Sequence, residues 1–579
     1  MSQLSLTPLK TPGKNEAFSV LDIEATKWIN FLTIGVYDGD TFIHFEKLDL
    51  FIHYIIHRSD HDSIPIRRYY AHFGGIYDFL FLLDAFLRHP DLSVSAITPR
   101  GSGILSFTVR TARNRIVFYD SSALFPFSLK KLTHSFGVTH RKMEIDHSKV
   151  TRVTPQLLKY LKYDCIGLYE SLKKFFKTPI IQDAGAAATL AGQALKVYRR
   201  RYLDRPIESL SVSCDHFMRR AYAGGRTEIF KPLFEGKRSA HLHCYDVNSL
   251  YPFVMADYEF PGSCEEVTNE KLDLSKMGFI EGEVLVPEGT YLPLLWTREN
   301  QTFKKFIFPT GRFKGVWSTL ELKEAIELGA KLTDFKQAYY FTNIGPIFKK
   351  YVEDLYQMRL DSKDEVQSII AKLLLNSLYG RFGINREREK LVIDQGQQGI
   401  IPYLQLKSGI RIAKKPIDLK IFSNVAIAAW VTALARIHMH RIMRKCEKTL
   451  YYTDTDSLFT TEELPTGSGI GKLKLEYSTR QACFLLPKTY YTDHKIVMKG
   501  FDKKKITHFK FEDFQDSLEG EIRLQIKEED KPFRLKGAMR RGKLLLIKKG
   551  ADKRIKSLYD KRVLIKTQNG WDSRPIHLN

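Results

Sequence analysis

The chain has 579 residues, more than a single hydrophobic core usually covers, so we expect several domains. Its 90 lysine and arginine residues outnumber its 66 aspartate and glutamate residues, and the net charge of +24 favours a nucleic-acid partner, although a solvated or membrane-facing surface can also be basic. We expect no zinc module, disulfide framework, membrane anchor or secretion signal, because the six cysteines lack CxxC or CxxH spacing and no apolar run is long enough.

The N-terminal part alternates β-rich runs with helical patterns, which predicts an α/β domain. In SVLDIEATKW, Asp22 and Glu24 lie two residues apart and therefore share one face of the expected strand. Asp78 enters an apolar helix, and Tyr160 and Asp164 lie four residues apart on one face of a later helix. Strands often carry an exposed DxE pair, but four carboxylates with a tyrosine indicate a two-metal site that hydrolyses phosphodiesters.

The next stretch, TPIIQDAGAAATLAG, is rich in small and turn-forming residues, and an arginine-rich helix follows it before YAGGRTEIF. We therefore expect a junction near residues 178–235. This junction would separate the N-terminal domain from a second set of carboxylates farther along the chain.

The second set lies in two β-rich segments that are far apart in the sequence. Asp246 follows an apolar run in YDVNSLYPFVM, while Asp454 and Asp456 lie in YYTDTDSLFT. A DxD pair alone is often an exposed turn, but a tight hairpin would bring its two carboxylates together, where they repel each other unless a cation intervenes. If Asp246 and Asp456 meet, they can hold two Mg²⁺ ions about 4 Å apart, the arrangement used in phosphoryl transfer.

Between these segments, IIAKLLLNSLYGRFG predicts a helix with Lys372, Asn376 and Tyr379 at i, i+4 and i+7 on one face. Lys372 would bind a triphosphate, and Tyr379 would stack on or beneath a base pair. Tyr251 follows the strand of Asp246 and would pack under the sugar of an incoming nucleotide, where it excludes a 2′-hydroxyl. For IIAKLLLNSLYGRFG, the alternative is an ordinary amphipathic helix.

The last 49 residues, 531–579, carry fifteen lysine or arginine residues against three acidic ones. Such a cationic segment is typical of a clamp on phosphates. A solvated C-terminal segment is the alternative.

Three of these stretches, DVNSLYP, KLLLNSLYG and YTDTDS in that order, resemble the polymerase motifs of family B DNA polymerases. YAGGR and PKTYY are similar to the YxGG and KxY motifs of the protein-primed branch, found in small Bacillus phages, adenoviruses and mitochondrial linear plasmids. The resemblance implies an α/β multidomain fold, with an RNase H-like 3′→5′ exonuclease domain before the palm, fingers and thumb of a right-hand polymerase. It also implies terminal-protein region insertions.

The resemblance also implies a role for individual residues of the polymerase half. The catalytic residues would be Asp246, Asp454 and Asp456. The metal ligands would be Asp246, Val247 and Asp456. The nucleotide-binding residues would be Tyr251, Lys372, Asn376 and Tyr379. The DNA contacts would be Tyr222, Gly224, Gly225, Arg226, Lys488 and Tyr490.

The N-terminal domain is similar to proofreading exonucleases, with metal ligands Asp22, Glu24, Asp78 and Asp164. Tyr160 would orient the nucleophilic water and Lys142, which follows YDSSALFPFSLKKLTHSFG, would position the scissile phosphate. One departure concerns an asparagine that relatives place before the aspartate of the second exonuclease motif. Phe73 and Gly74 stand there instead, so we expect the preference for single strands to rest partly on His72.

Asp246 and Lys372 lie 126 positions apart, farther than in other family B enzymes, which favours an insertion between them. A shorter excess would form a hairpin that encircles the template and so displaces the second strand. The expected boundaries are an exonuclease domain over 1–180, a linker with the YxGG motif over 181–235, the palm over 236–257 and 417–510, the first terminal-protein region insertion over 258–348, the fingers over 349–393, the second terminal-protein region insertion over 394–416 and the thumb over 511–579.

We therefore expect a monomeric DNA polymerase with proofreading, two Mg²⁺ ions per active site (Mn²⁺ as a substitute), and primer-template DNA and dNTPs as partners. Only about 20 residues precede Asp22, too few for a fused priming domain, so a priming terminal protein would be a separate chain. A phage enzyme would act in bacterial cytoplasm and a plasmid enzyme in a mitochondrion.

Three alternatives compete with this reading. The first is an enzyme of the same lineage that extends nucleic-acid primers only. The second, a reverse transcriptase, would not combine SLYP and NSLYG with an exonuclease quartet. The third, a non-catalytic DNA-binding scaffold, would not need every ligand position to be filled.

Overall fold

The structure is a computed structural model. The residues that it describes are 4–13, 17–61, 66–236, 240–298, 306–362, 365–385, 389–393, 401–405, 411–416, 422–520, 524–527, 529–555, 559–568 and 570–579. Within these residues, none of the helices is both long enough and apolar enough to cross a membrane.

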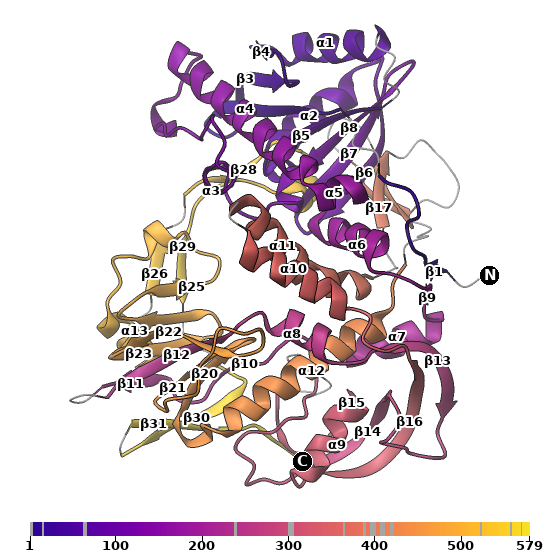
Figure 1. Cartoon of the computed structure of the whole chain (residues 1–579). Coiled ribbons are helices and arrows are strands. Elements are labelled where there is room, and N and C mark those ends of the chain that lie inside the picture. Colours follow the sequence, from indigo (N-terminus) through magenta and orange to yellow (C-terminus); the bar gives the residue numbers. More distant parts are fainter. Residues whose placement is uncertain are drawn as a thin grey trace.

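A mixed sheet forms the centre of the N-terminal domain, at the top of Figure 1. Its strands from this domain are β2 (Ser19–Thr26), β3 (Asn30–Tyr37), β4 (Phe42–Phe45), β5 (Ile66–Ala71), β6 (Ser93–Arg100), β7 (Gly103–Arg110) and β8 (Arg115–Asp120). The helices are α1 (Leu48–His61), α2 (Asp78–Arg88), α3 (Leu129–Ser135) and α4 (Pro155–Lys177). The rings of Phe107 on β7 and Phe118 on β8 stack with centroids 4.6 Å apart in the core. Aromatic packing against α2 holds this sheet in place.

The long helix α4 begins where the sequence provides a cap. The Thr154 side chain accepts a hydrogen bond from the backbone N–H of Leu157, and Pro155 occupies the first turn, where its missing N–H is not needed. The helix buries Leu161 and Leu168 toward the sheet. This packing holds Asp164 against the carboxyl end of β2.

The segment 181–235, which we expected to be a linker, is folded. It contributes α6 (Leu190–Arg201), α7 (Val212–Ala221), the short strand β9 (Ile207–Glu208), which pairs with β1 (Ser5–Leu6), and the end of α5 (Pro179–Ala184). Ile181, Ala194 and Val197 are fully buried in the largest core. The small residues that predicted a flexible junction instead allow these helices to pack closely.

The polymerase motifs meet on a five-stranded sheet of order β10, β20, β21, β12, β22. The strands are β10 (Thr227–Ile229), β12 (Leu242–Val247), β20 (Leu450–Asp454), β21 (Ser457–Thr460) and β22 (Leu473–Thr479). Four helices pack beside it: α8 (Leu250–Asp257), α10 (Lys349–Asp361), α11 (Glu365–Phe382) and α12 (Val425–Arg444). Because β12 pairs with β21, the hairpin YYTDTDSLFT lies next to the strand of Asp246, as the sequence predicted.

A neighbouring four-stranded sheet carries the KxY motif. Its strands are β11 (Leu233–Glu235), β23 (Gln481–Leu486), β24 (Thr489–Thr492) and β25 (Ile496–Met498), and α13 (Phe511–Glu519) packs on it. Residues 258–348 form another sheet with a core of its own. Its elements are β13 (Pro261–Thr268), β14 (Gly278–Val286), β15 (Thr310–Ser318), β16 (Lys331–Asn343) and α9 (Thr319–Glu327).

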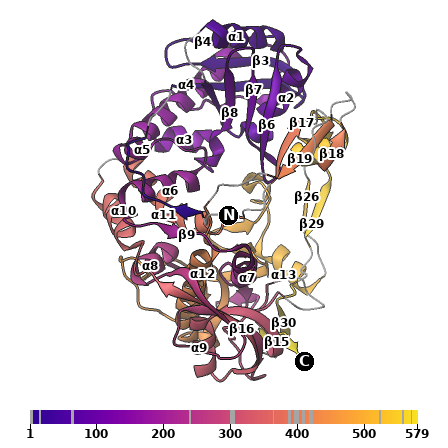
Figure 2. The ribbon, with the colours of Figure 1, turned by 90° about the vertical axis from the view of Figure 1, so that its right-hand side faces the viewer.

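The strands β17 (Glu389–Ile393), β18 (Ile401–Gln405) and β19 (Arg411–Pro416) extend the N-terminal sheet (Figure 2). Leu391 of β17 pairs with Ile97 of β6, so the strands added to this sheet include Glu389–Ile393, which precede the expected insertion of 394–416. Of the residues expected in the insertion, 394–400 and 406–410 lie outside those described.

The C-terminal residues, expected as one thumb, contact three parts of the molecule. Leu535 of α14 (Leu535–Met539) is buried in the N-terminal core, and β32 (His577–Leu578) pairs with β15 of the insertion sheet. The remaining strands are β26 (Leu524–Lys527), β27 (Lys531–Pro532), β28 (Ile547–Lys548), β29 (Asp552–Ile555), β30 (Arg562–Thr567) and β31 (Gly570–Pro575). This segment therefore ties the domains together as well as carrying positive charge.

A buried ionic cluster joins this segment to the polymerase sheet. Glu228 of β10 lies 2.7 Å from Arg226 and 3.7 Å from Arg562, and all three side chains are at most 4% exposed. Tyr559 and Lys561 contact the same strand, since the Tyr559 hydroxyl accepts from the N–H of Ile229 and Lys561 donates to the carbonyl of Thr227.

We predict that Glu228→Gln lowers the free energy of unfolding by about 3–5 kcal/mol, because it leaves two buried guanidinium groups without an anion. Urea denaturation followed by circular dichroism measures the change. The matched control is Glu266→Gln, which removes an exposed ion pair with Lys276 and should cost at most about 1 kcal/mol. Equal losses in the two variants would contradict the assigned role of the cluster.

Candidate active sites

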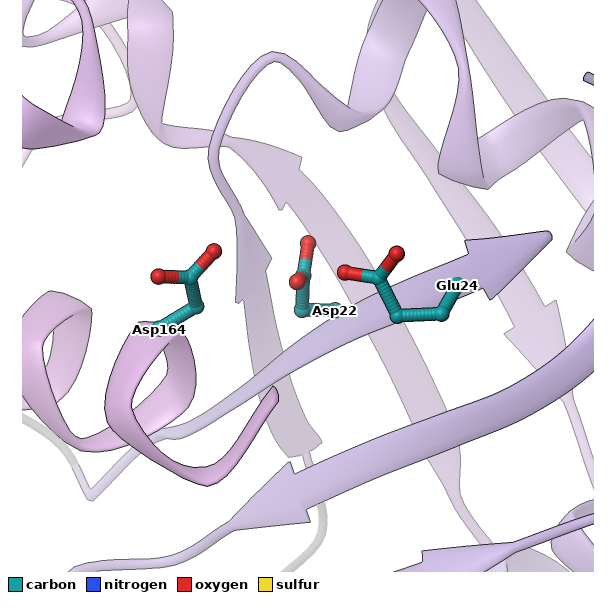
Figure 3. A group of neighbouring side chains, drawn as sticks. All are labelled: Asp22, Glu24 and Asp164. Atoms are coloured by element: carbon teal, nitrogen blue, oxygen red, sulfur yellow. The ribbon is translucent and has the colours of Figure 1, made fainter. Parts of the chain in front are cut away.

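Three carboxylates gather at the carboxyl end of β2. Asp22 and Glu24 come from the strand and Asp164 from α4, and one oxygen from each lies within 4.8 Å of the others. In Figure 3 their carboxylates lie side by side in the space between the strand and the helix. Asp22 and Glu24, which the i, i+2 spacing places on one face of the strand, therefore lie beside a helix from about 140 positions later in the chain.

A second group of side chains surrounds this cluster. Asp78 is 3% exposed and accepts a hydrogen bond of 2.8 Å from the N–H of Ile23, between the two β2 carboxylates. Lys142 donates to both Asp164 and the hydroxyl of Tyr160. The structure thus brings together all six residues that the sequence predicted for a hydrolytic site.

Close approach and desolvation raise the pKa values of these carboxylates. Burial first, and then the charge of Asp164, raise the pKa of Glu24 to about 8. Burial raises the pKa of Asp78 to about 7, and burial followed by the charges of Asp78 and Glu24 raises that of Asp22 well above its ordinary value. Four carboxylates with one lysine leave the group anionic once it is deprotonated.

The donor set fits a hard divalent cation. All the candidate ligands are carboxylates, the donors that Mg²⁺ and Mn²⁺ prefer. The Oδ1 atom of Asp164 is buried without a hydrogen-bond partner within the described structure, so it retains a lone pair for an ion. A cation at this point would replace the protons that burial otherwise retains.

The cluster opens into a pocket of about 520 Å³, whose wall includes two aromatic residues that sequence reasoning missed. Trp28 is 46% exposed, with a φ of 67°, and its ring meets that of Tyr77 edge-on at 5.9 Å. The turn that directly follows DIEAT could have indicated Trp28, because a short turn between two strands leaves its side chains at the rim of the carboxylate site.

His72 does not occupy the position that we expected. Its Nδ1 lies 3.0 Å from the Ser121 hydroxyl and its Nε2 lies 2.8 Å from the carbonyl of Phe127. Burial lowers the pKa of His72 to about 4, so the ring is neutral and its two nitrogens contact the protein. The adjacent Phe73 is 37% exposed, and it is this ring that faces solvent.

The second site is built on the β20–β21 hairpin. Asp246 pairs with Ser457 across β12 and β21, and Thr455, at the tip of the hairpin, has a φ of 68°. Burial and the charge of Asp456 raise the pKa of Asp246 to about 7, and burial also raises that of Asp456. The charge of Asp456 thus acts on Asp246, while that of Asp454 acts on Asp456.

Asp454 faces another partner. Its carboxylate is bound at 2.7 and 2.9 Å by the Nζ of Lys488 and accepts a bond of 3.2 Å from the hydroxyl of Thr227. The backbone of Lys488 has a φ of 60°. Its ammonium neutralises one aspartate of the DxD pair. This leaves Asp456 and Asp246 as the carboxylates available to a metal, with Val247 beside them through a backbone bond to Asp456.

The YAGGR loop contacts the tip of the hairpin. A Cβ on Gly225 would lie 2.8 Å from the side chain of Thr455, and the N–H of Thr455 donates to the carbonyl of Arg226 at 2.8 Å. Glycine is required at this position because the two backbones approach so closely. The side chain of Arg226 is buried against Glu228, which gives it a structural role, and its contact with DNA stays a prediction.

The other expected DNA contacts differ in exposure. Gly224 is exposed, and Tyr222 is half-buried with its ring against Gly383. Tyr490 is only 8% exposed and packs among aromatic rings, 5.5 Å from that of Tyr452, so its ring supports the hairpin from beneath. Lys488 is the member of the KxY motif that reaches the site.

Helix α11 presents the predicted face to this site. Lys372 and Asn376 are exposed, and the ring of Tyr379 stacks on that of Tyr251 with centroids 4.5 Å apart. The charge of Lys372 also lowers the pKa of Asp246 slightly, against the larger effect of burial. Helix α11 thus contributes an exposed cation, an exposed amide and the ring of Tyr379, which stacks on Tyr251 of α8.

Comparison with known proteins now places this arrangement in a family. The model of DNA polymerase type B, organellar and viral, matches residues 147–420. A probable DNA polymerase of Neurospora intermedia is 26% identical over 516 residues, which cover 74% of this chain and 52% of that protein. The DNA-directed DNA polymerase of Enterobacteria phage PRD1 is 29% identical over 410 residues, covering 67% of this chain and 66% of that protein.

The chain resembles the family B DNA polymerases, whose organellar and viral model matches a little under half of its length. The resemblance inferred from its motifs is thereby confirmed. Its fold is that of phi29 DNA polymerase, whose complex with primer-template DNA and incoming nucleotides covers 93% of this chain and 100% of that one, with a TM-score of 0.73 and 20% identity. The chain spans about half the length, or less, of the fungal relatives that it matches.

We predict that the free energy of unfolding of this chain falls as the pH rises when no divalent cation is present. Glu24 binds its proton more tightly in the folded chain, with a pKa of about 8 against an ordinary value of 4.5, so its stabilising contribution disappears between these two pH values. Thermal melting in EDTA from pH 5 to 9, for the natural chain and Glu24→Gln, measures the effect. The melting temperature of Glu24→Gln should rise relative to that of the natural chain as the pH rises, and Mg²⁺ should reduce this difference. A difference in melting temperature that stays constant with pH would contradict the proton assignment.

Proposed function

We propose that the chain is a DNA-directed DNA polymerase with a 3′→5′ proofreading exonuclease, which replicates a linear phage or plasmid genome. The observation that carries this proposal is the presence of two separate carboxylate groups, each with its own lysine, on the fold of phi29 DNA polymerase. Divalent cations bound there would neutralise the carboxylates and polarise phosphate oxygens. Mg²⁺ is the proposed ion at both sites, with Mn²⁺ as a substitute.

In the synthetic site, Asp246 and Asp456 would hold the cations, and Lys488 would keep Asp454 from adding a third negative charge. Lys372 and Asn376 would bind the nucleotide phosphates at the exposed face of α11. The stacked pair Tyr251 and Tyr379 would form the floor under the sugar and the nascent base pair. This arrangement would align the primer hydroxyl with the nucleotide phosphate.

In the hydrolytic site, Asp22, Glu24, Asp78 and Asp164 would be the ligands. Tyr160 would orient the attacking water through its hydroxyl, and Lys142, which binds both Tyr160 and Asp164, would fix that hydroxyl and neutralise the scissile phosphate. The exposed Trp28 would border the 3′ end of a single strand.

We further infer priming by a separate terminal protein and displacement of the second strand. The insertion of residues 258–348, folded as its own sheet, supports the first inference, because it offers a surface near the polymerase sheet. The hairpin of β17 and β19, joined to β6, supports the second, because a template passing beside it would leave little room for a duplex. Extension from nucleic-acid primers alone is the alternative.

A primer assay tests the central proposal. A 5′-labelled primer on a longer template, with a blocking downstream strand and Mg²⁺, should extend through the block with dNTPs and shorten without them. A non-catalytic DNA-binding scaffold would bind the primer and leave its length unchanged. Addition of dAMP to a co-encoded protein in place of a primer would establish protein priming.

We predict that Asp456→Asn lowers extension at least about a thousandfold, because a metal ligand of the transferring phosphate is lost. Primer shortening should stay at the level of the natural chain, since the two carboxylate groups share no residue. The matched variant Asp22→Asn with Glu24→Gln should give the reverse result. Loss of both activities in either variant would contradict two independent sites.

We predict that Tyr251→Val admits ribonucleotides. Removing the ring opens space under the sugar, so the discrimination against rNTPs should fall about 10- to 100-fold, measured as the ratio of kcat/KM for dATP and ATP. Tyr251→Phe retains the ring and should discriminate like the natural chain. Unchanged discrimination in Tyr251→Val would place the sugar elsewhere.

A further inference from the structure

A second cavity of the N-terminal domain has a composition that none of the proposed activities uses. It has a volume of about 520 Å³ and lies where β2, β5, β8, α4 and α6 meet. It shares no lining residue with the pocket of the carboxylate cluster. On α4, Lys173 lies nine residues beyond Asp164, about 13 Å along the helix axis. The cavity is therefore a separate feature of the same domain, of a size that ordinarily holds a small ligand.

Aromatic rings form one wall of this cavity. Tyr119 is half-buried and stacks on Tyr70 with ring centroids 5.3 Å apart, and Phe18 lies 4.8 Å from Tyr169. Tyr70 is only 4% exposed, so it supports Tyr119 from behind. The partly exposed rings of Tyr119 and Tyr169 offer flat faces on which a nucleobase can stack.

Cations form the rim. Lys173 and Lys177 project from α4 one turn apart, and both are exposed, with no ion pair to any described residue. Arg68 of β5 and Lys196 of α6 also line the cavity. Among the lining residues that the structure describes there is no aspartate or glutamate. A group of cations beside aromatic rings attracts an anionic, aromatic ligand.

Lys196 supports the same conclusion. Its ammonium donates to the carbonyl of Ala186 at 2.6 Å, and burial lowers its pKa. A bound anion near this ammonium would offset the cost of burying its charge. The chain therefore keeps a partly desolvated cation at this place without a carboxylate to balance it.

We propose that this cavity is a second nucleotide-binding site, in which Tyr119 stacks on the base while Lys173 and Lys177 bind the phosphates. Two sources share this chemistry, a free nucleoside triphosphate and a nucleotide unit of a single strand. The same two lysines also line a hollow on the other side of α4 that reaches Val366 and Gln367 of α11. A ligand held by these lysines therefore lies beside the first turns of the helix that carries Lys372.

Equilibrium dialysis of radiolabelled dATP, and separately of a 5′-labelled oligothymidylate of six nucleotides, tests the proposal with the full chain in EDTA. EDTA removes metal-dependent binding and all catalysis, so the result does not depend on the proposed activities. Lys173→Ala with Lys177→Ala should weaken binding of the true ligand about tenfold, as the loss of two phosphate contacts requires. The matched control is Lys159→Ala with Lys162→Ala, which removes the same charge from α4 outside the cavity and should leave the affinity unchanged.

The aromatic half of the proposal needs its own variants. Tyr119→Ala should weaken binding about tenfold, because a stacking face is lost, while Tyr119→Phe should bind like the natural chain. A lysine-dependent loss for dATP alone identifies a free nucleotide, and a loss for the oligonucleotide identifies a single strand. Equal affinity of the natural chain and the Lys173 and Lys177 variant for both ligands would overturn the proposal. Tripolyphosphate that binds as tightly as dATP would also overturn it.

Discussion

Mutual repulsion among desolvated carboxylates is the constraint on which this structure depends. Two groups of acidic side chains are wholly or partly buried, and the raised pKa values of Glu24 and Asp246 are the direct result. The chain reduces the repulsion in the same way at both places, with a lysine from a different element: Lys142 binds Asp164, and Lys488 binds Asp454. Each lysine neutralises one acid and leaves the rest for cations and phosphate.

Holding such groups together requires a rigid scaffold. In the N-terminal domain the scaffold is a stacked aromatic core beneath β2 and α2. In the polymerase half it is the strand β10, which pairs with β20 through Thr227 and Asp454. Tyr559, Lys561 and Arg562 contact this one short strand from the far end of the sequence. The basic C-terminal segment is therefore a structural support for the catalytic hairpin as well as a candidate surface for DNA.

The same long-range connections join the two sites in one molecule. The hairpin of β17 and β19 extends the N-terminal sheet, α14 is buried in the N-terminal core, and β32 completes the insertion sheet. Figure 2 shows β17 and β19 on the side opposite α4 and α6, where they join the N-terminal sheet.

The sequence by itself determined the local geometry of the N-terminal carboxylate site, since the spacing of Asp22 and Glu24 on a strand and of Tyr160 and Asp164 on a helix follows from backbone periodicity. The motif order was likewise enough to indicate the family. Only the tertiary structure decided which polar side chains face the sites. Arg226 and Tyr490 are buried, and His72 is bound by Ser121 and Phe127, because their surroundings come from residues distant in the sequence. The helices of 181–235 and the dispersed C-terminal segment depend in the same way on packing against distant elements, which neighbouring residues do not encode.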